Sequence, residues 1–131
     1  MFIFIYGDND CKLTKARKEA LHNEIDNCIK NGYTKFFLST TNNFCKEAHD
    51  YLTEKLKTND NLNIVIYYKS NINTIFANIP FISSSRSFPY IEEYEYDLAK
   101  ECDYMISLIS LKNTTYYTMF LSLAKNHKNL F

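Results

Sequence analysis

Short runs of apolar residues alternate along this chain with longer stretches in which apolar residues recur every three or four positions. The runs predict buried strands, and the longer stretches predict amphipathic helices. We therefore expect an α/β fold of three layers, Rossmann-like, in which helices flank a mostly parallel sheet of four or five strands. The strands are expected at residues 2–6, 35–39, 62–68 and 104–110, with a very short fifth at 129–131, and the helices at 14–30, from the turn at 40–43 to about 57, at 90–101 and at 116–125.

Residues with known end preferences mark the expected helices. Thr14 is expected to cap the first helix at its amino end, and Gly32 is well placed to end it. The turn at residues 40–43 offers amide and hydroxyl side chains that can cap the second helix. We expect the core-facing helix positions to be Leu21, Ile25, Cys28, Ile29, Phe44, Ala48, Tyr51, Leu52, Leu56, Ile91, Tyr94, Leu98, Met119, Phe120, Leu123 and Ala124.

Composition narrows the class of protein. A length of 131 residues fits one domain, spanning 1–131, and a hydrophobic content of 46% excludes a disordered chain. The formal net charge of zero gives no electrostatic case for binding nucleic acid. The chain is rich in Asn, Lys, Ile and Tyr, which is typical of an AT-rich coding genome and indicates a bacterial or phage-like origin. A single Asn or Lys therefore carries little functional weight.

The cysteines and the apolar runs bear on location. Cys11, Cys28, Cys45 and Cys102 lack the short spacings of zinc or redox motifs, and Cys28 is expected to be a small buried thiol. No apolar run approaches the roughly 18 residues of a membrane span. We expect a cytoplasmic protein with reduced thiols and no membrane partner.

In an open parallel sheet, ligands bind at the carboxyl ends of the strands, near the point where the strand order reverses. Four segments should meet there, at residues 7–10, 39–43, 68–70 and 110–115, and they are rich in small hydroxyl and amide side chains. Such segments suit a phosphate or carboxylate, although the same residue types are also the usual helix caps and turn formers. The candidate ligand-binding residues are Gly7, Asp8, Asn9, Ser39, Thr40, Thr41, Asn42, Tyr68, Lys69, Arg86, Asn113, Thr114 and Thr115.

The long connection at residues 69–89 has two interpretations. It is either a functional segment such as a lid or an ordinary excursion with one short helix. Arg86 lies in its serine-rich part, where a guanidinium would suit a phosphate by bidentate pairing; the alternative is an ordinary exposed loop residue. Among the tyrosines, Tyr68 and either Tyr116 or Tyr117 are best placed to stack on a base.

The order of elements resembles the SLOG superfamily, the Rossmann-like group that includes DprA, the LOG (lonely guy) phosphoribohydrolases and the YpsA-like proteins. The resemblance rests on the strand that leads into Gly7, the strand and turn at 35–43, and the segment 99–106. Cys102–Ile106 fits the family's "a-D-x-x-I" segment, and Asn113–Thr115 stands in the place of its Gly-rich turn. The resemblance implies a nucleotide-type ligand and pairing of two copies through helices.

Departures from the family pattern concern its catalytic residues. Thr118 stands where LOG enzymes carry a Glu, and Tyr94 and Glu95 stand near the place of their Arg. The chain also lacks the glycines that let backbone approach phosphate closely. The resemblance therefore implies the fold without the hydrolase activity, and we expect no catalytic residues and no cofactor.

The other clusters of polar residues can be explained by ordinary structural roles as well as by catalysis or metal binding. Glu92, Glu93, Glu95 and Asp97 are expected to form a solvated helix face, although a paired-carboxylate acid–base role is the alternative. Asp8 and Asp10 are expected to be turn residues rather than acids or metal ligands. The three histidines, His22, His49 and His127, are too widely separated for metal spacing, so no metal site is expected.

Three hypotheses about function remain open. The first is a non-catalytic module that binds a nucleotide or nucleotide-derived ligand. The second is a nucleotide-processing enzyme, such as an N-glycosidase, with a rearranged active site that would need a buried carboxylate, for which Asp8, Asp10 and Glu93 are the candidates. The third is a dimerising interaction protein without a small ligand. A homodimer fits all three.

Overall fold

A five-stranded, all-parallel sheet forms the middle layer of the computed structural model, which describes residues 1–8, 11–39, 42–67, 93–110 and 114–131. The strand order is β3-β2-β1-β4-β5, so β1 is central. The α/β fold with a parallel sheet is confirmed. The elements are β1 (Ile3–Gly7), α1 (Lys15–Lys30), β2 (Lys35–Ser39), α2 (Asn43–Leu56), β3 (Asn63–Tyr67), α3 (Glu93–Glu101), β4 (Tyr104–Leu108), α4 (Thr114–Leu123) and β5 (His127–Asn129).

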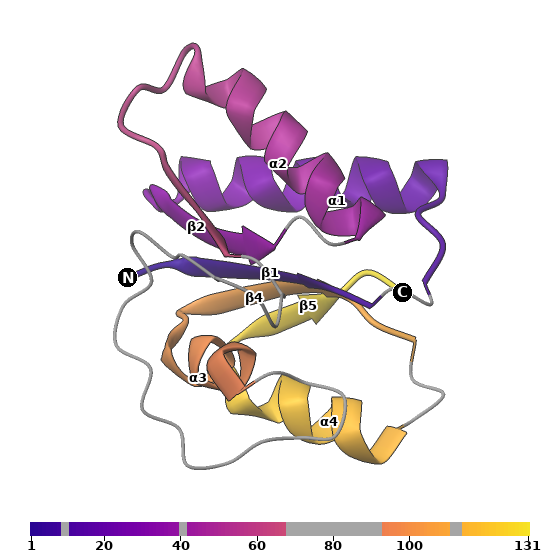
Figure 1. Ribbon diagram of the computed structural model, residues 1–131. Coiled ribbons are helices and arrows are strands. Elements are labelled where there is room, and N and C mark those ends of the chain that lie inside the picture. Colours follow the sequence, from indigo (N-terminus) through magenta and orange to yellow (C-terminus); the bar gives the residue numbers. More distant parts are fainter. Residues whose placement is uncertain (9–10, 40–41, 68–92, 111–113) are drawn as a thin grey trace.

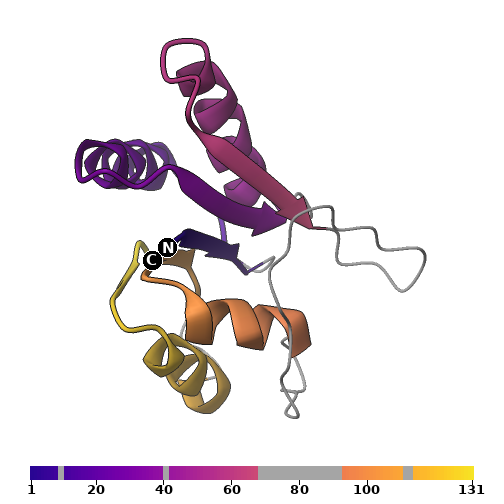
Figure 2. The same cartoon turned by 90° about the vertical axis from the view of Figure 1, so that its left-hand side faces the viewer.

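The helices cover both faces of the sheet. Helices α1 and α2 lie on one face, and α3 and α4 lie on the other (Figure 1). This arrangement follows from the right-handedness of connections between parallel strands. The chain moves outward from β1 to β2 and β3, and then crosses to the other side of β1 to form β4 and β5. Because the direction of travel reverses, the helices change face, as the turned view also shows (Figure 2).

The central strand β1 is buried on both sides. Phe4 and Tyr6 belong to the core cluster that α3 and α4 cover, whereas Ile3 and Ile5 belong to the cluster beneath α1 and α2. None of the four is more than 3% exposed. Side chains of a strand alternate between faces, so β1 sends aromatic rings to one helical layer and isoleucines to the other. A continuous apolar run is therefore what this position in the sheet requires.

The predicted helix ends are confirmed in α1. The Thr14 hydroxyl accepts a hydrogen bond from the Arg17 backbone N–H at 3.2 Å, as an amino-terminal cap does. At the other end Gly32 has a φ of +95°, and its N–H donates to the Ile29 carbonyl at 3.0 Å. A left-handed conformation of this kind favours glycine and turns the chain toward β2.

Two of the expected core residues are exposed. Met119 is 49% exposed because the buried stripe of α4 runs through Tyr117, Phe120 and Leu121, which leaves Met119 on the outer side. Leu56 is 37% exposed, because α2 ends at this residue. Ile91 lies outside the described residues. Within the described part of the chain, each helix is too short or too polar to cross a membrane.

Three of the four cysteines are buried free thiols. Cys28 is 4% exposed, as expected, and Cys45 and Cys102 are 1% and 0% exposed. Burial disfavours the thiolate and raises the pKa of each of these thiols from 9.0 to about 12. The folded protein thus holds these thiols neutral at a pH where an unfolded chain would already lose their protons.

We expect the protein to lose stability as the pH rises from about 9 toward 12. Below pH 9 the thiols are neutral in both states, so their contribution is fully present. Above pH 9 the unfolded chain releases protons that the folded chain retains, which favours unfolding by up to about 1.4 kcal/mol per pH unit for each thiol. Urea unfolding under reducing conditions at pH 8 and pH 10.5 measures this loss.

Cys45→Ala is the matched variant for this test. It removes one buried titrating group, so its free energy of unfolding should fall less steeply between the two pH values than that of the wild type. An equal slope in both proteins would contradict the assignment to the buried thiols.

Candidate functional site

The carboxyl ends of four strands meet at one edge of the sheet. Gly7 of β1 is paired with Leu108 of β4, and Ser39 of β2 is paired with Tyr67 of β3. The strand order reverses between β1 and β4, which makes this junction the topological switch point of the sheet. The Asp8 N–H extends the junction by donating to the Leu108 carbonyl at 2.9 Å. The fold thus provides the edge at which the sequence predicts a ligand site.

Gly7 and Asn42 are brought together at this edge. The Asn42 side chain accepts a hydrogen bond from the Cys45 N–H at 2.8 Å and donates one to the Gly7 carbonyl at 3.1 Å. It therefore caps α2 and ties the cap to the end of β1. A Cβ atom on Gly7 would lie 2.4 Å from Asn42 Oδ1 and 2.9 Å from Phe44 Cβ. Glycine is required here because the cap of α2 packs directly on the backbone.

The remaining described candidates differ in exposure. Asp8 is half-buried, and its carbonyl accepts a hydrogen bond from the Cys11 N–H at 3.1 Å, which closes a turn. Ser39 is 1% exposed and points into the protein. Asn9, Thr40, Thr41, Tyr68, Lys69, Arg86 and Asn113 lie outside the described residues, as do the side chains of Thr114, Thr115 and Tyr116. Their assignment as ligand contacts stays a prediction.

Glu95, at the same edge of the sheet, is a buried carboxylate that the sequence pattern did not predict to be buried. Glu95 lies in the first turn of α3 and is 1% exposed. It occupies the same helical stripe as Leu98, Ala99 and Cys102, which belong to the core on that face of the sheet. The Tyr67 hydroxyl, at the end of β3, donates a hydrogen bond to Glu95 Oε2 at 2.6 Å. Figure 2 shows the arrowhead of β3 and the first turn of α3 on the same side of the molecule.

The expected solvated face of α3 is therefore wrong for two of its members. Asp97 is 3% exposed and, like Glu95, is buried, whereas Glu93 is exposed. Every residue from Glu95 to Ala99 is buried, so the middle of α3 is enclosed around its whole circumference. A helix of this kind has no solvated face in its middle turns, and its charged residues are buried with the others. Glu92 lies outside the described residues.

Buried tyrosines lie on the same side of the sheet as the buried carboxylate. Tyr6, in β1, is 3% exposed and belongs to the same core cluster as Tyr117, in α4. Burial, and next the charge of Glu95, raises the pKa of Tyr6 and of Tyr67 well above its usual range. Both phenols therefore keep their protons at neutral pH and act as hydrogen-bond donors. Tyr117 is 8% exposed, and its role in stacking on a base stays a prediction.

An open pocket of about 470 Å³ lies on the other face, at the same end of the sheet. Its walls are the segment before α1 and the first turns of α2. Two lysines, Lys12 and Lys46, line it, and within the described part of the chain neither forms an ion pair. Glu47 also lines it, but its carboxylate is engaged by Lys18 at 3.4 Å and by His22 at 2.7 Å. The lining residues are Cys11, Lys12, Leu13, Asn43, Lys46, Glu47 and Asp50.

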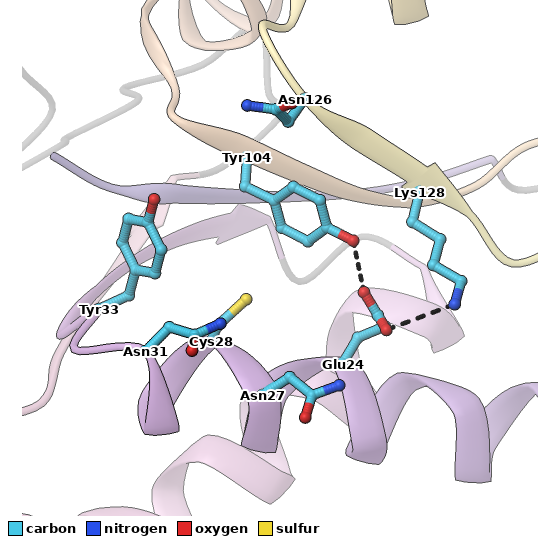
Figure 3. Close-up of a pocket in the computed structure, with 8 residues that line it drawn as sticks. All are labelled: Glu24, Asn27, Cys28, Asn31, Tyr33, Tyr104, Asn126 and Lys128. Carbon is cyan, nitrogen blue, oxygen red and sulfur yellow. Dashed lines mark hydrogen bonds and ion pairs between the residues drawn. The ribbon is translucent and has the colours of Figure 1, made fainter.

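A second pocket of about 470 Å³ lies between α1 and the amino ends of β4 and β5, away from the predicted site (Figure 3). Glu24 points into it and holds both walls together. It accepts a hydrogen bond from the Tyr104 hydroxyl and forms an ion pair of 3.5 Å with Lys128. Because the two charges that line this pocket are paired with each other, it offers less to an anion than the pocket at the carboxyl edge.

Comparison with known proteins adds no assignment: protein-family models, curated proteins and solved structures each gave no match to this chain.

We expect Gly7→Ala to lower the free energy of unfolding by about 1–3 kcal/mol, because the added methyl group would overlap the Asn42 side chain. Urea unfolding measures the loss. In an Asn42→Gly background the nearest overlapping atom is gone, and glycine at a cap position costs only a few tenths of a kcal/mol. The same Gly7→Ala change should then cost less. An equal cost in both backgrounds would show that the contact with Asn42 does not constrain residue 7.

Proposed function

We propose that this chain is a non-catalytic module that binds a nucleotide or nucleotide-derived ligand, containing phosphate, at the carboxyl ends of its parallel strands. The observation that carries the proposal is the switch point between β1 and β4, since open parallel sheets bind ligands at such points. The ligand would lie over Gly7 and Asp8 and extend toward the amino end of α2.

The electrostatics of this edge support an anionic ligand. The amino ends of helices carry partial positive charge, and the first turns of α1, α2 and α4 contain no acidic residue, whereas that of α3 contains Glu93 and Glu95. Lys12 and Lys46 add two positive charges beside the amino end of α2, in a pocket that Glu47 and Asp50 also line. The Arg17 guanidinium donates a hydrogen bond of 2.7 Å to the Lys12 carbonyl, which fixes the backbone of that wall. A phosphate near these groups would be stabilised by dipoles and charges together.

Membership of the SLOG superfamily is part of the proposal. The all-parallel sheet is the Rossmann-like topology that the resemblance implies. The segment Cys102–Ile106, which resembles the family's, forms the entry into β4. Thr118, at the place of the family's Glu, is exposed on α4. The missing carboxylate at that position supports a binding module rather than a family-type hydrolase.

A second candidate function is a nucleotide-processing enzyme of the N-glycosidase type. It would require a buried carboxylate at the ligand-binding edge, and Glu95 is such a group, in place of the Asp8, Asp10 and Glu93 considered from the sequence. Release of free base from a nucleotide would establish this function and overturn the non-catalytic one.

A thermal-shift screen against nucleotides, cyclic nucleotides, ribose phosphates and inorganic phosphate tests the proposal. A compound present at 100 times its dissociation constant should add about 2.7 kcal/mol of stability, seen as a rise of several degrees in Tm. A flat screen with folded protein would refute ligand binding. It would favour the dimerising interaction protein, for which Met119 and Phe131, 49% and 56% exposed, offer apolar surface.

The double variant Lys12→Ala/Lys46→Ala should weaken binding of any phosphate-containing hit about tenfold or more, as loss of a charged contact does. Lys57→Ala is the matched control, because Lys57 lies at the carboxyl end of α2, where it pairs with Glu54. Isothermal titration calorimetry compares the affinities. An equal loss in both variants would indicate a general effect of charge and contradict a phosphate position near the amino end of α2.

A further inference from the structure

We propose that Glu95 is a ligand-binding residue, and that its buried carboxylate accepts a hydrogen bond from the ribose 2′-hydroxyl of the nucleotide bound at the carboxyl edge. The inference rests on the proposed function and names the part of the ligand that this side of the site recognises. It is argued from the position of Glu95 in the core, from its neighbours and from the sign of its charge.

Glu95 stands where the packing of α3 calls for an apolar side chain. Leu98, Ala99 and Cys102 share its stripe, and they are 2%, 0% and 0% exposed. Removing a carboxylate from water carries a large desolvation penalty, and a well-packed apolar residue at such a site is often neutral or stabilising. Apolar packing alone therefore does not account for a glutamate in this stripe. Conflicts between local pattern and fold of this kind are expected at functional sites.

The neighbours of Glu95 place it at the ligand-binding end of the sheet. Helix α3 runs antiparallel to the strands: its first turn meets Tyr67 at the end of β3, and just beyond its last turn the Asp103 N–H donates to the Phe2 carbonyl at the beginning of β1. Tyr6, whose pKa is raised by burial and next by the charge of Glu95, precedes Gly7 at the switch point. The carboxylate thus lies beneath the edge at which the phosphate-containing ligand is proposed to bind.

The charge of Glu95 decides which part of a nucleotide it can meet. A carboxylate in a site that excludes water repels a phosphate and binds a hydroxyl donor strongly. Ribose supplies such donors, whereas the phosphate is favoured at the positive amino ends of α1 and α2. The Tyr67 hydroxyl already donates to Glu95 Oε2, so a ribose hydroxyl that reaches this buried oxygen competes with Tyr67 for it. The Tyr67 bond therefore competes with the ligand and stabilises the ligand-free protein.

The test compares AMP, GMP, CMP and UMP with the same nucleotides lacking the 2′-hydroxyl, and with inorganic phosphate, by isothermal titration calorimetry. The wild type should bind at least one ribonucleotide about tenfold or more tightly than its 2′-deoxy counterpart. In Glu95→Gln this preference should disappear, while inorganic phosphate binds as in the wild type and the urea midpoint stays equal or rises.

Tyr67→Phe is the matched variant. Removing the competing donor should preserve or increase the preference for ribonucleotides, while the urea midpoint falls because a buried carboxylate has lost a hydrogen bond. A purely structural Glu95–Tyr67 pair predicts the opposite pattern: both variants would lower the midpoint, and neither would change the ratio of ribonucleotide to deoxyribonucleotide affinity.

The outcomes separate the inference from the proposed function. Binding of nucleotides or phosphate with equal affinity for ribose and deoxyribose forms overturns the role of Glu95 and leaves the proposed function standing. The wild-type comparison gives this answer even if Glu95→Gln fails to fold. No binding of any nucleotide or of phosphate overturns the proposed function, and the inference falls with it.

Discussion

The structure depends on one constraint: β1 lies in the middle of a parallel sheet and has to be buried on both faces. A parallel neighbour is reached only by a crossover, and crossovers of one hand on either side of β1 place helices above and below it. Phe4 and Tyr6 fill one core, while Ile3 and Ile5 fill the other. The same constraint fixes the switch point, because the strand order reverses at β1. The central position of β1 therefore determines both the hydrophobic core and the place where a ligand is proposed to bind.

Most of the fold could be predicted from the chain because its signals are local. Thr14 and Gly32 mark the ends of α1 through their own backbone and side-chain preferences, so their roles could be assigned without knowledge of the sheet. Met119 could not be placed, since a helix with apolar residues on several sides has more than one candidate stripe, and only its packing partner selects one. In α4 the selected stripe passes through Tyr117, Phe120 and Leu121.

The candidate site was less predictable, for a related reason. Charged residues on a short helix are assigned to solvent by default, and this default is wrong for Glu95 and Asp97. The helical spacing of Glu95 with Leu98, Ala99 and Cys102 is consistent with a buried Glu95. A buried stripe through Tyr94 and Leu98 is equally regular in the sequence, so the spacing alone does not select between them. Gly7 was expected only as a candidate ligand-binding residue, which stays a prediction. Its observed role is to make room for Asn42, a contact across 35 residues that no local pattern encodes.

The strand at the carboxyl end of the chain also limits how the sheet can grow. β5 has three residues and forms the edge beside β4. Its last side chain, Asn129, turns inward and forms two hydrogen bonds with the backbone of Ile109, at 2.9 and 3.0 Å, as a further strand residue would. The sheet is thus extended on the β4 side by an amide side chain, while only a short outward row of backbone groups is left for an incoming strand. Short edge strands are a recognised protection against edge-to-edge aggregation, and β5, with three residues, is such a strand.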